Sequence, residues 1–64
     1  MYIVEKLLRQ RRVNRKTQWL IKWHGYPEHE ATWENEDNVK NVSHWNVLVG
    51  EYQQLQREVN RGRM

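Results

Sequence analysis

The segment TQWLIKWH, residues 17–24, limits more than any other what this chain can fold into. Its side chains alternate, so that Trp19, Ile21 and Trp23 fall on one face and Lys22 on the other. Successive side chains of a β-strand point to opposite faces, and this alternation therefore predicts a strand with one apolar face. Any fold of this chain must cover that face.

The residues before this segment are expected to pair with it as a hairpin. Residues 2–13 mix apolar and charged side chains and contain the β-branched residues that favour strands. The turn is predicted at Asn14–Lys16, because asparagine tolerates the left-handed backbone of a tight hairpin. Gly25 and Pro27 are expected to end the second strand.

Two further elements are predicted downstream. The segment ATWE, residues 31–34, is short, β-prone and flanked by charged residues, which indicates a third strand. Ser43 is expected to cap a helix. One face of that helix carries apolar residues at the three-and-four spacing of an amphipathic helix: Trp45, Leu48, Val49, Tyr52 and Leu55.

These elements predict an α+β fold, in which a small, curved, three-stranded antiparallel sheet packs against one C-terminal helix. We expect one domain over residues 1–58 and a frayed basic tail over residues 59–64. The expected core comprises Ile21, Trp33, Leu48, Tyr52 and one of Leu7 and Leu8.

The composition excludes several classes of protein. A chain of 64 residues without cysteine has neither disulfides nor thiolate metal sites, which is typical of reducing compartments. Its apolar runs are too short for a membrane span, and we expect no membrane partner.

Ser43, the only serine, is better explained as a cap than as a nucleophile, and the three histidines lack the spacing of a zinc site. So short a chain has little material to enclose Glu34 and Glu36 as an acid–base pair. We therefore expect no enzyme, no catalytic residue, no metal and no cofactor.

Positive and negative side chains lie in different parts of the chain. An acidic segment follows the second predicted strand and lies beside aromatic residues, which suits a cationic ligand. The first strand and its turn are basic instead, and form a candidate nucleic-acid patch. That patch comprises Arg9, Arg11, Arg12, Arg15 and Lys16.

The aromatic residues around Gly25 suggest a binding site. Trp23 and Tyr26 flank this glycine, so a chain reversal there would turn one ring toward the other. Tyr2 adds a third ring if the first strand pairs with the second, and Glu30 lies close enough in sequence to add a negative charge. Electron-rich ring faces attract quaternary ammonium groups. On the residue pattern alone, packing of Trp23 and Tyr26 in the core remains the simpler alternative.

Three motifs taken together resemble the chromodomain family: YIVEKLL at 2–8, WLIKWHGYP at 19–27 and ATWENEDNV at 31–39. The family pattern is Tyr-x-Val-Glu-Lys, then Leu-x-Lys-Trp-x-Gly-Tyr, then Thr-Trp-Glu-x-Glu-x-Asn. The resemblance is close over residues 2–40 and looser to about Leu55. It implies the sheet and helix predicted above. The segment GYPEHEATWENEDNVKN and the basic ends are also similar to chromodomains at the C-terminal end of retrotransposon integrases.

The resemblance implies a nuclear module that reads methylated lysine on a histone tail, with histone H3 as the expected partner. The family's cage positions match Tyr2, Trp23 and Tyr26, and its acidic residue beside the cage matches Glu30. Its peptide-groove positions match Val4, Glu34 and Asn38.

The resemblance further implies that the histone segment inserts as an added β-strand, between the N-terminal strand and residues 36–40. Two alternatives stay open. The basic first strand and hairpin would bind DNA or RNA if the cage were vestigial. A third class of function is a protein-interaction module that docks partners through its helix.

Overall fold

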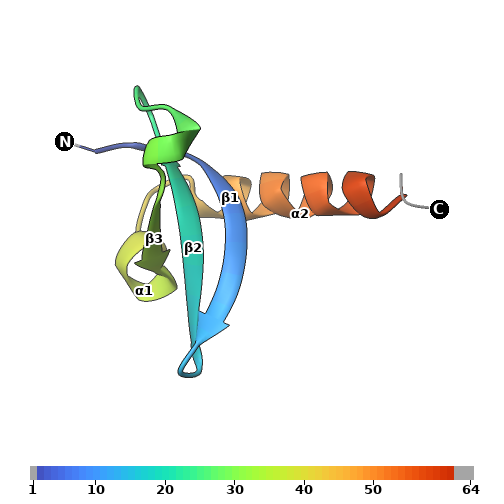
Figure 1. Ribbon diagram of the computed structural model, residues 1–64, viewed down its shortest axis with the longest axis horizontal. Coiled ribbons are helices and arrows are strands. Elements are labelled where there is room, and N and C mark those ends of the chain that lie inside the picture. The colour runs from blue at the N-terminus through green and yellow to red at the C-terminus, as the bar shows by residue number, and fades with distance from the viewer. Residues whose placement is uncertain (1, 62–64) are drawn as a thin grey trace.

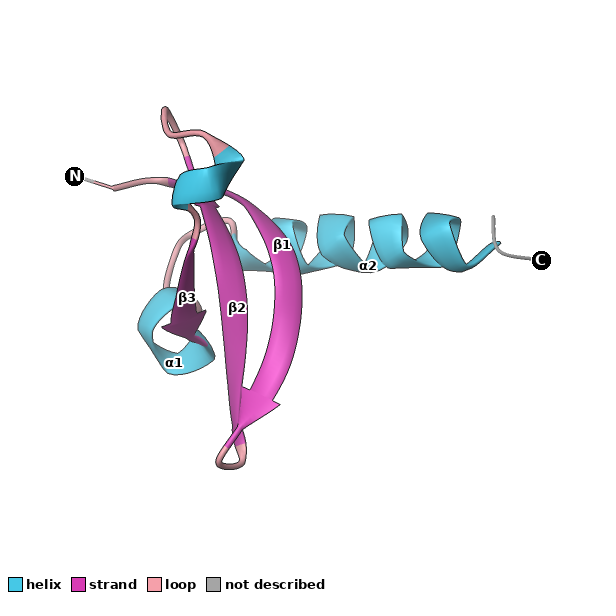
Figure 2. Cartoon of the chain, in the orientation of Figure 1, coloured by secondary structure: helices cyan, strands magenta, loops and turns pink. Residues whose placement is uncertain are grey.

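The computed structural model describes residues 2–61. Its three strands form one antiparallel sheet in the order β1-β2-β3, and the long helix α2 crosses β1 and extends beyond the sheet (Figure 1; Figure 2 colours the same view by secondary structure). The predicted α+β fold, a three-stranded sheet with a C-terminal helix, is confirmed. In chain order the elements are β1 (Val4–Val13), β2 (Lys16–Trp23), the 3-10 helix η1 (Glu28–Glu30), β3 (Thr32–Asn35), α1 (Glu36–Val39) and α2 (Trp45–Arg61).

The β1–β2 hairpin closes through a two-residue turn at Asn14 and Arg15, within the segment predicted for it. Both residues have positive φ, 51° at Asn14 and 66° at Arg15. Hairpin turns of this kind favour Asn followed by Gly, because a Cβ in the left-handed region is crowded. That crowding costs roughly 1–2 kcal/mol per residue for an ordinary L-residue. Arg15 therefore occupies a position at which glycine would be more stable.

The core lies between the sheet and the helices. Among the expected members, Ile21 and Leu48 are buried, Leu7 is buried rather than Leu8, and Tyr52 packs against the core while remaining half-buried. Over residues 2–61 the buried apolar residues are Val4, Leu7, Trp19, Ile21, Val39 and Leu48.

The prediction that Trp33 belongs to the core is wrong. The register of β2 and β3 pairs Leu20 with Trp33, so Trp33 lies on the face of the sheet opposite Ile21. There its ring is half-buried beneath the Arg11 guanidinium, 4.0 Å from the ring centroid. Trp19 takes the core position instead and is only 3 % exposed.

Helix α2 differs from the prediction at both ends. The Leu48 N–H donates to the His44 carbonyl at 3.1 Å, so His44, and not Ser43, is the residue that caps the helix. The helix continues to Arg61, so residues 59–61, which were predicted to belong to a frayed tail, have helical backbone; residues 62–64 lie outside the described part. The short helix α1 was not predicted. Over residues 2–61, no helix is both long and apolar enough to cross a membrane.

A cross-strand ion pair links β1 and β2 near the open end of the hairpin. The Glu5 carboxylate accepts a hydrogen bond from the Lys22 ammonium at 2.9 Å and lies 3.7 Å from His24 Nδ1. The bond to Lys22 is the largest cause that holds the pKa of Glu5 below its ordinary value of 4.5.

Because the folded state lowers this pKa, the contribution of Glu5 to stability is present above the ordinary value and lost as pH falls through the lowered one. We expect Glu5→Gln to reduce the difference in melting temperature between about pH 7 and about pH 3, measured by circular dichroism. An unchanged difference in the variant would contradict this role.

Candidate functional site

Tyr2 reaches Trp23 because the pairing of the first two strands continues past the end of β1. Val4 lies opposite Trp23 in the register, and the His24 N–H donates to the Ile3 carbonyl at 2.8 Å. This bond holds the N-terminal segment beside the end of β2. The side chain of Tyr2 is thereby placed next to that of Trp23.

Tyr26 returns to the same place through a tight turn. Its N–H donates to the Trp23 carbonyl at 3.1 Å, and Gly25, at the third position of the turn, has φ +86°. A positive φ at this position favours glycine, because a Cβ would be strained there. The turn therefore folds Tyr26 back toward the strand that carries Trp23.

The three rings converge without stacking in parallel. The Tyr2 centroid lies 5.8 Å from that of Trp23, with 63° between the planes, and 5.8 Å from that of Tyr26, with 39° between the planes. Tyr2 is 70 % exposed and Tyr26 is 42 % exposed, whereas Trp23 is half-buried and packs against the core. Two of the rings are therefore available to a ligand at little cost to the core.

A relay of hydrogen bonds holds the Trp23 ring in place. The Trp23 Nε1–H donates to Thr32 Oγ1 at 2.8 Å, and the Thr32 hydroxyl donates to Glu34 Oε2 at 2.9 Å. Thr32 and Glu34 are two residues apart in β3 and so point to the same face of the sheet. Thr32 was not predicted, although its i, i+2 spacing with an acidic residue is a signal that could have identified it.

The rings, the relay and η1 line one open cavity of about 510 Å³. This volume falls within the roughly 300–1,000 Å³ that is typical of small-ligand sites. Its lining includes two carboxylates, Glu30 and Glu34, and no basic side chain. The cavity therefore offers ring faces and negative charge together, which suits an organic cation. The lining residues are Tyr2, Trp23, Tyr26, Glu30, Thr32, Glu34, Asn38 and Val39.

Of the three residues predicted for the peptide groove, two line the cavity and one is buried in the core. Glu34 and Asn38 line the cavity, as do all four residues predicted for the cage. Val4 is only 5 % exposed and belongs to the core, so it has almost no surface with which to contact a peptide. Residues 36–39 form the helix α1. The insertion of a histone segment between the N-terminal strand and residues 36–40 stays a prediction.

The predicted basic patch is spread over the hairpin far from this cavity. Arg9 and Arg11 lie opposite Leu20 and Gln18 on the outer face of the sheet, and Arg12 lies opposite Thr17 on the other face. Arg11 is engaged, since its Nε donates to Gln18 Oε1 at 2.7 Å. Arg15 is in the turn, and Lys16 begins β2.

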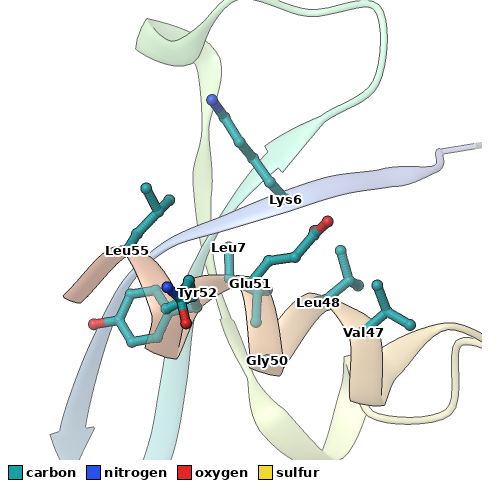
Figure 3. Close-up of a pocket in the computed structure, with 9 residues that line it drawn as sticks. Lys6, Leu7, Val47, Leu48, Gly50, Glu51, Tyr52 and Leu55 are labelled. Carbon is teal, nitrogen blue, oxygen red and sulfur yellow. The ribbon is translucent and has the colours of Figure 1, made fainter. Parts of the chain in front are cut away.

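A second cavity, of about 550 Å³, lies between β1 and α2. Its floor is apolar, and Lys6 and Glu51 lie along its sides (Figure 3). Tyr52 is its only aromatic residue, so it lacks the converging ring faces of the first cavity. Over residues 2–61, no three His, Cys, Asp or Glu side chains are grouped so as to hold a metal ion.

Comparison with known proteins agrees with this architecture. The chain is 50 % identical over 40 residues to the chromo domain-containing protein rhino of Drosophila melanogaster, covering 62 % of this chain and 10 % of that protein. It is 47 % identical over 38 residues to heterochromatin protein 1 of Drosophila melanogaster, covering 59 % and 18 %. It is 38 % identical over 40 residues to the chromobox protein homolog hpl-1 of Caenorhabditis elegans, covering 62 % and 22 %.

These matches span at most 22 % of the length of the three relatives, so they concern one module and not a whole protein. The model of the Chromo (CHRromatin Organisation MOdifier) domain matches residues 2–55. That match covers the three strands, the turn at Gly25 and most of α2. The chain therefore belongs to the chromo domain family, and is a chromatin-binding module.

Proposed function

We propose that the cavity at the open end of the β1–β2 hairpin binds a methylated lysine side chain of a histone tail. The observation that carries the proposal is the convergence of Tyr2, Trp23 and Tyr26 on a cavity that also contains two carboxylates. A methylated ammonium keeps its positive charge but has few or no N–H groups to donate. Ring faces are then its best partners, each contributing about 0.5–2 kcal/mol. The module binds and does not catalyse.

The charges of the cavity favour a cation over a neutral side chain. Glu30 comes from η1 and Glu34 from β3, so negative charge reaches the cavity from two separate elements. An unmethylated lysine carries the same charge, but its ammonium is strongly hydrated and loses those water contacts among the rings. Methylation removes this penalty, so the methylated form is favoured.

The rest of the peptide has a free strand edge beside the cavity. The strand order leaves β1 at one edge of the sheet, and Tyr2 and Ile3, which precede it, are exposed. A histone segment that pairs with this edge adds backbone hydrogen bonds to the contacts of the lysine side chain. Asn38, on the other side of the cavity, is an amide that can bond to the peptide backbone. A histone tail as ligand places the module in the nucleus.

The test is a fluorescence titration with histone H3 peptides that carry unmodified, mono-, di- or trimethylated lysine, at two salt concentrations. We expect the trimethylated peptide to bind at least about tenfold more tightly than the unmodified one, a difference of about 1.4 kcal/mol. Binding to all peptides with equal affinity would contradict methyl-lysine recognition.

The hydrogen-bond relay gives a prediction of its own. Thr32→Val keeps the branched shape but removes the acceptor of the Trp23 indole and the bond to Glu34. A hydrogen bond of this kind contributes about 1 kcal/mol, so we expect roughly fivefold weaker binding of the trimethylated peptide. Thr32→Ser retains the hydroxyl and should bind nearly as well as the original chain. Its Trp23 indole N–H resonance should also keep its chemical shift, whereas that of Thr32→Val should move. Equal losses in both variants would exclude the relay.

A further inference from the structure

The closed end of the β1–β2 hairpin carries positive charge that the fold does not use. Within residues 2–61, Arg9, Arg12, Arg15 and Lys16 form no ion pair and no side-chain hydrogen bond with another residue. By contrast, Lys6, Lys22 and Lys40 each lie within ion-pair distance of a carboxylate. Four uncompensated cations in one hairpin repel one another, so the folded chain alone gives no reason for the cluster.

The nearest carboxylates are already engaged. Glu36 and Asp37 share a shallow cavity of about 210 Å³ with Arg15 and Lys16. However, Glu36 Oε2 accepts the Trp19 indole N–H at 2.9 Å, and Asp37 Oδ1 lies 3.1 Å from Lys40 Nζ. In the described part of the chain neither acid lies within ion-pair distance of Arg15 or Lys16, so the side chains of the turn are free to reach an external anion.

A second shallow cavity on the hairpin, of about 200 Å³, is lined entirely by hydrogen-bond donors. They are Gln10, Arg11, Arg12 and Thr17, and none is acidic. Guanidinium groups match the geometry of phosphate oxygens, and hydroxyl and amide groups add further bonds to them. The lining of this cavity is therefore suited to a phosphate group.

The strained backbone at the turn also indicates that the Arg15 side chain has a binding role. Arg15 has φ 66°, where glycine would relieve the strain, yet the residue there is an arginine at the outermost point of the hairpin. Unfavourable backbone conformations of this kind are retained where the side chain has a use. Here the side chain adds one more cation to the surface just described.

We infer that the hairpin tip, residues 9–17, binds the phosphate backbone of double-stranded DNA. The third strand pairs with β2 only as far as Gln18, so residues 12–17 at the end of the tip form a ribbon of two strands. The major groove of B-form DNA, about 12 Å wide, admits such a ribbon, whereas the major groove of A-form RNA is too deep and narrow.

The tip is the closed end of the hairpin (Figure 1), whereas Trp23 of the aromatic cavity lies at its open end. Val4 pairs with Trp23 at one end and Val13 with Lys16 at the other. At the rise of a β-strand these ends are roughly 30 Å apart. The two surfaces share no residue, so DNA binding does not depend on what occupies the cavity, and one module can hold a tail and DNA together.

The test is fluorescence anisotropy with a labelled DNA duplex over a range of salt concentrations. We expect the logarithm of the affinity to fall linearly with the logarithm of salt concentration, with a slope of about −2 to −4 for this number of contacts. Arg15→Gly should make the slope less steep by about 0.9 and weaken binding at low salt. The same variant should melt about 4–8 °C higher, because it relieves the strained turn. Arg12→Gln, which leaves the turn unchanged, should make the slope less steep by the same amount.

Arg57→Gln on α2 is the matched control, since it removes one positive charge away from the hairpin. It should change the slope little, and an effect as large as that of Arg15→Gly would assign the binding to net charge and overturn the proposal. Absence of binding at low salt would also overturn it. RNA duplex of the same sequence should bind more weakly; equal or tighter binding of RNA would overturn the assignment to DNA.

Discussion

A Trp23→Ala protein is expected to bind the trimethyl-lysine peptide at least about 30-fold more weakly, a loss of about 2 kcal/mol, while keeping a cooperative fold. Trp23 offers the largest ring face in the cavity, and Tyr2 contacts it directly at 5.8 Å between centroids. Its removal opens the cavity to water, which weakens the attraction of the remaining rings for a cation. The measurement is a peptide titration followed by tyrosine or label fluorescence, paired with a thermal melt.

Because Trp23 also packs against the core, its loss will lower the melting temperature to some extent. Tyr26→Ala separates the two effects, since Tyr26 is 42 % exposed and has little role in packing. We expect that variant to lose binding as well and to melt within a few degrees of the original chain. Retained binding in both variants would contradict the proposed cage.

Trp19→Ala is expected to have the opposite outcome, with loss of the fold itself. Trp19 lies on the same face of β2, but it is buried and makes edge-to-face contacts with Trp45 at 5.7 Å and Tyr52 at 5.0 Å. Its indole N–H also donates to Glu36. Truncation of a buried tryptophan costs about 3–5 kcal/mol. A domain of this size has only about 3–10 kcal/mol of stability in total.

We therefore expect the Trp19→Ala protein to melt at least about 12 °C lower, or to lack a cooperative transition, by circular dichroism. Trp33→Ala is the matched control, because Trp33 is half-buried on the opposite face and contacts Arg11. Its melting temperature should fall much less. A Trp33→Ala protein that unfolds while Trp19→Ala remains folded would contradict the assignment of the core.

The fold was predictable where the pattern was long. The eight residues of β2 alternate clearly, the ten of β1 contain β-branched residues that favour strands, and the apolar stripe of α2 follows helical spacing. The face on which Trp33 lies was not predictable, because β3 has only four residues and a shift of one residue in register moves every side chain to the other face. Helix α1, also four residues long, is too short for periodicity to reveal.

The residues that line the aromatic cavity were predictable, but the side chains that hold them in place were not. The motifs of the family identified Tyr2, Trp23 and Tyr26, and Glu30 followed from its place after the turn. The role of Thr32 depends on a side-chain hydrogen bond across strands, and the sequence signals it only through the i, i+2 spacing of Thr32 and Glu34. The burial of Val4 and the helical backbone at residues 36–39 depend on tertiary packing, which local sequence does not determine.

The central claim is that Tyr2, Trp23 and Tyr26 enclose a space selective for a cation. The most direct measurement compares two peptides that differ at one atom, one with trimethyl-lysine and one with its neutral carbon isostere, which ends in a tert-butyl group. Both fill the cavity to the same extent, but only the first is attracted by the ring faces and by Glu30 and Glu34. We predict at least about tenfold tighter binding of the cation, about 1.4 kcal/mol. Equal affinity for the two peptides would show that the cavity selects size and not charge, and would contradict the account.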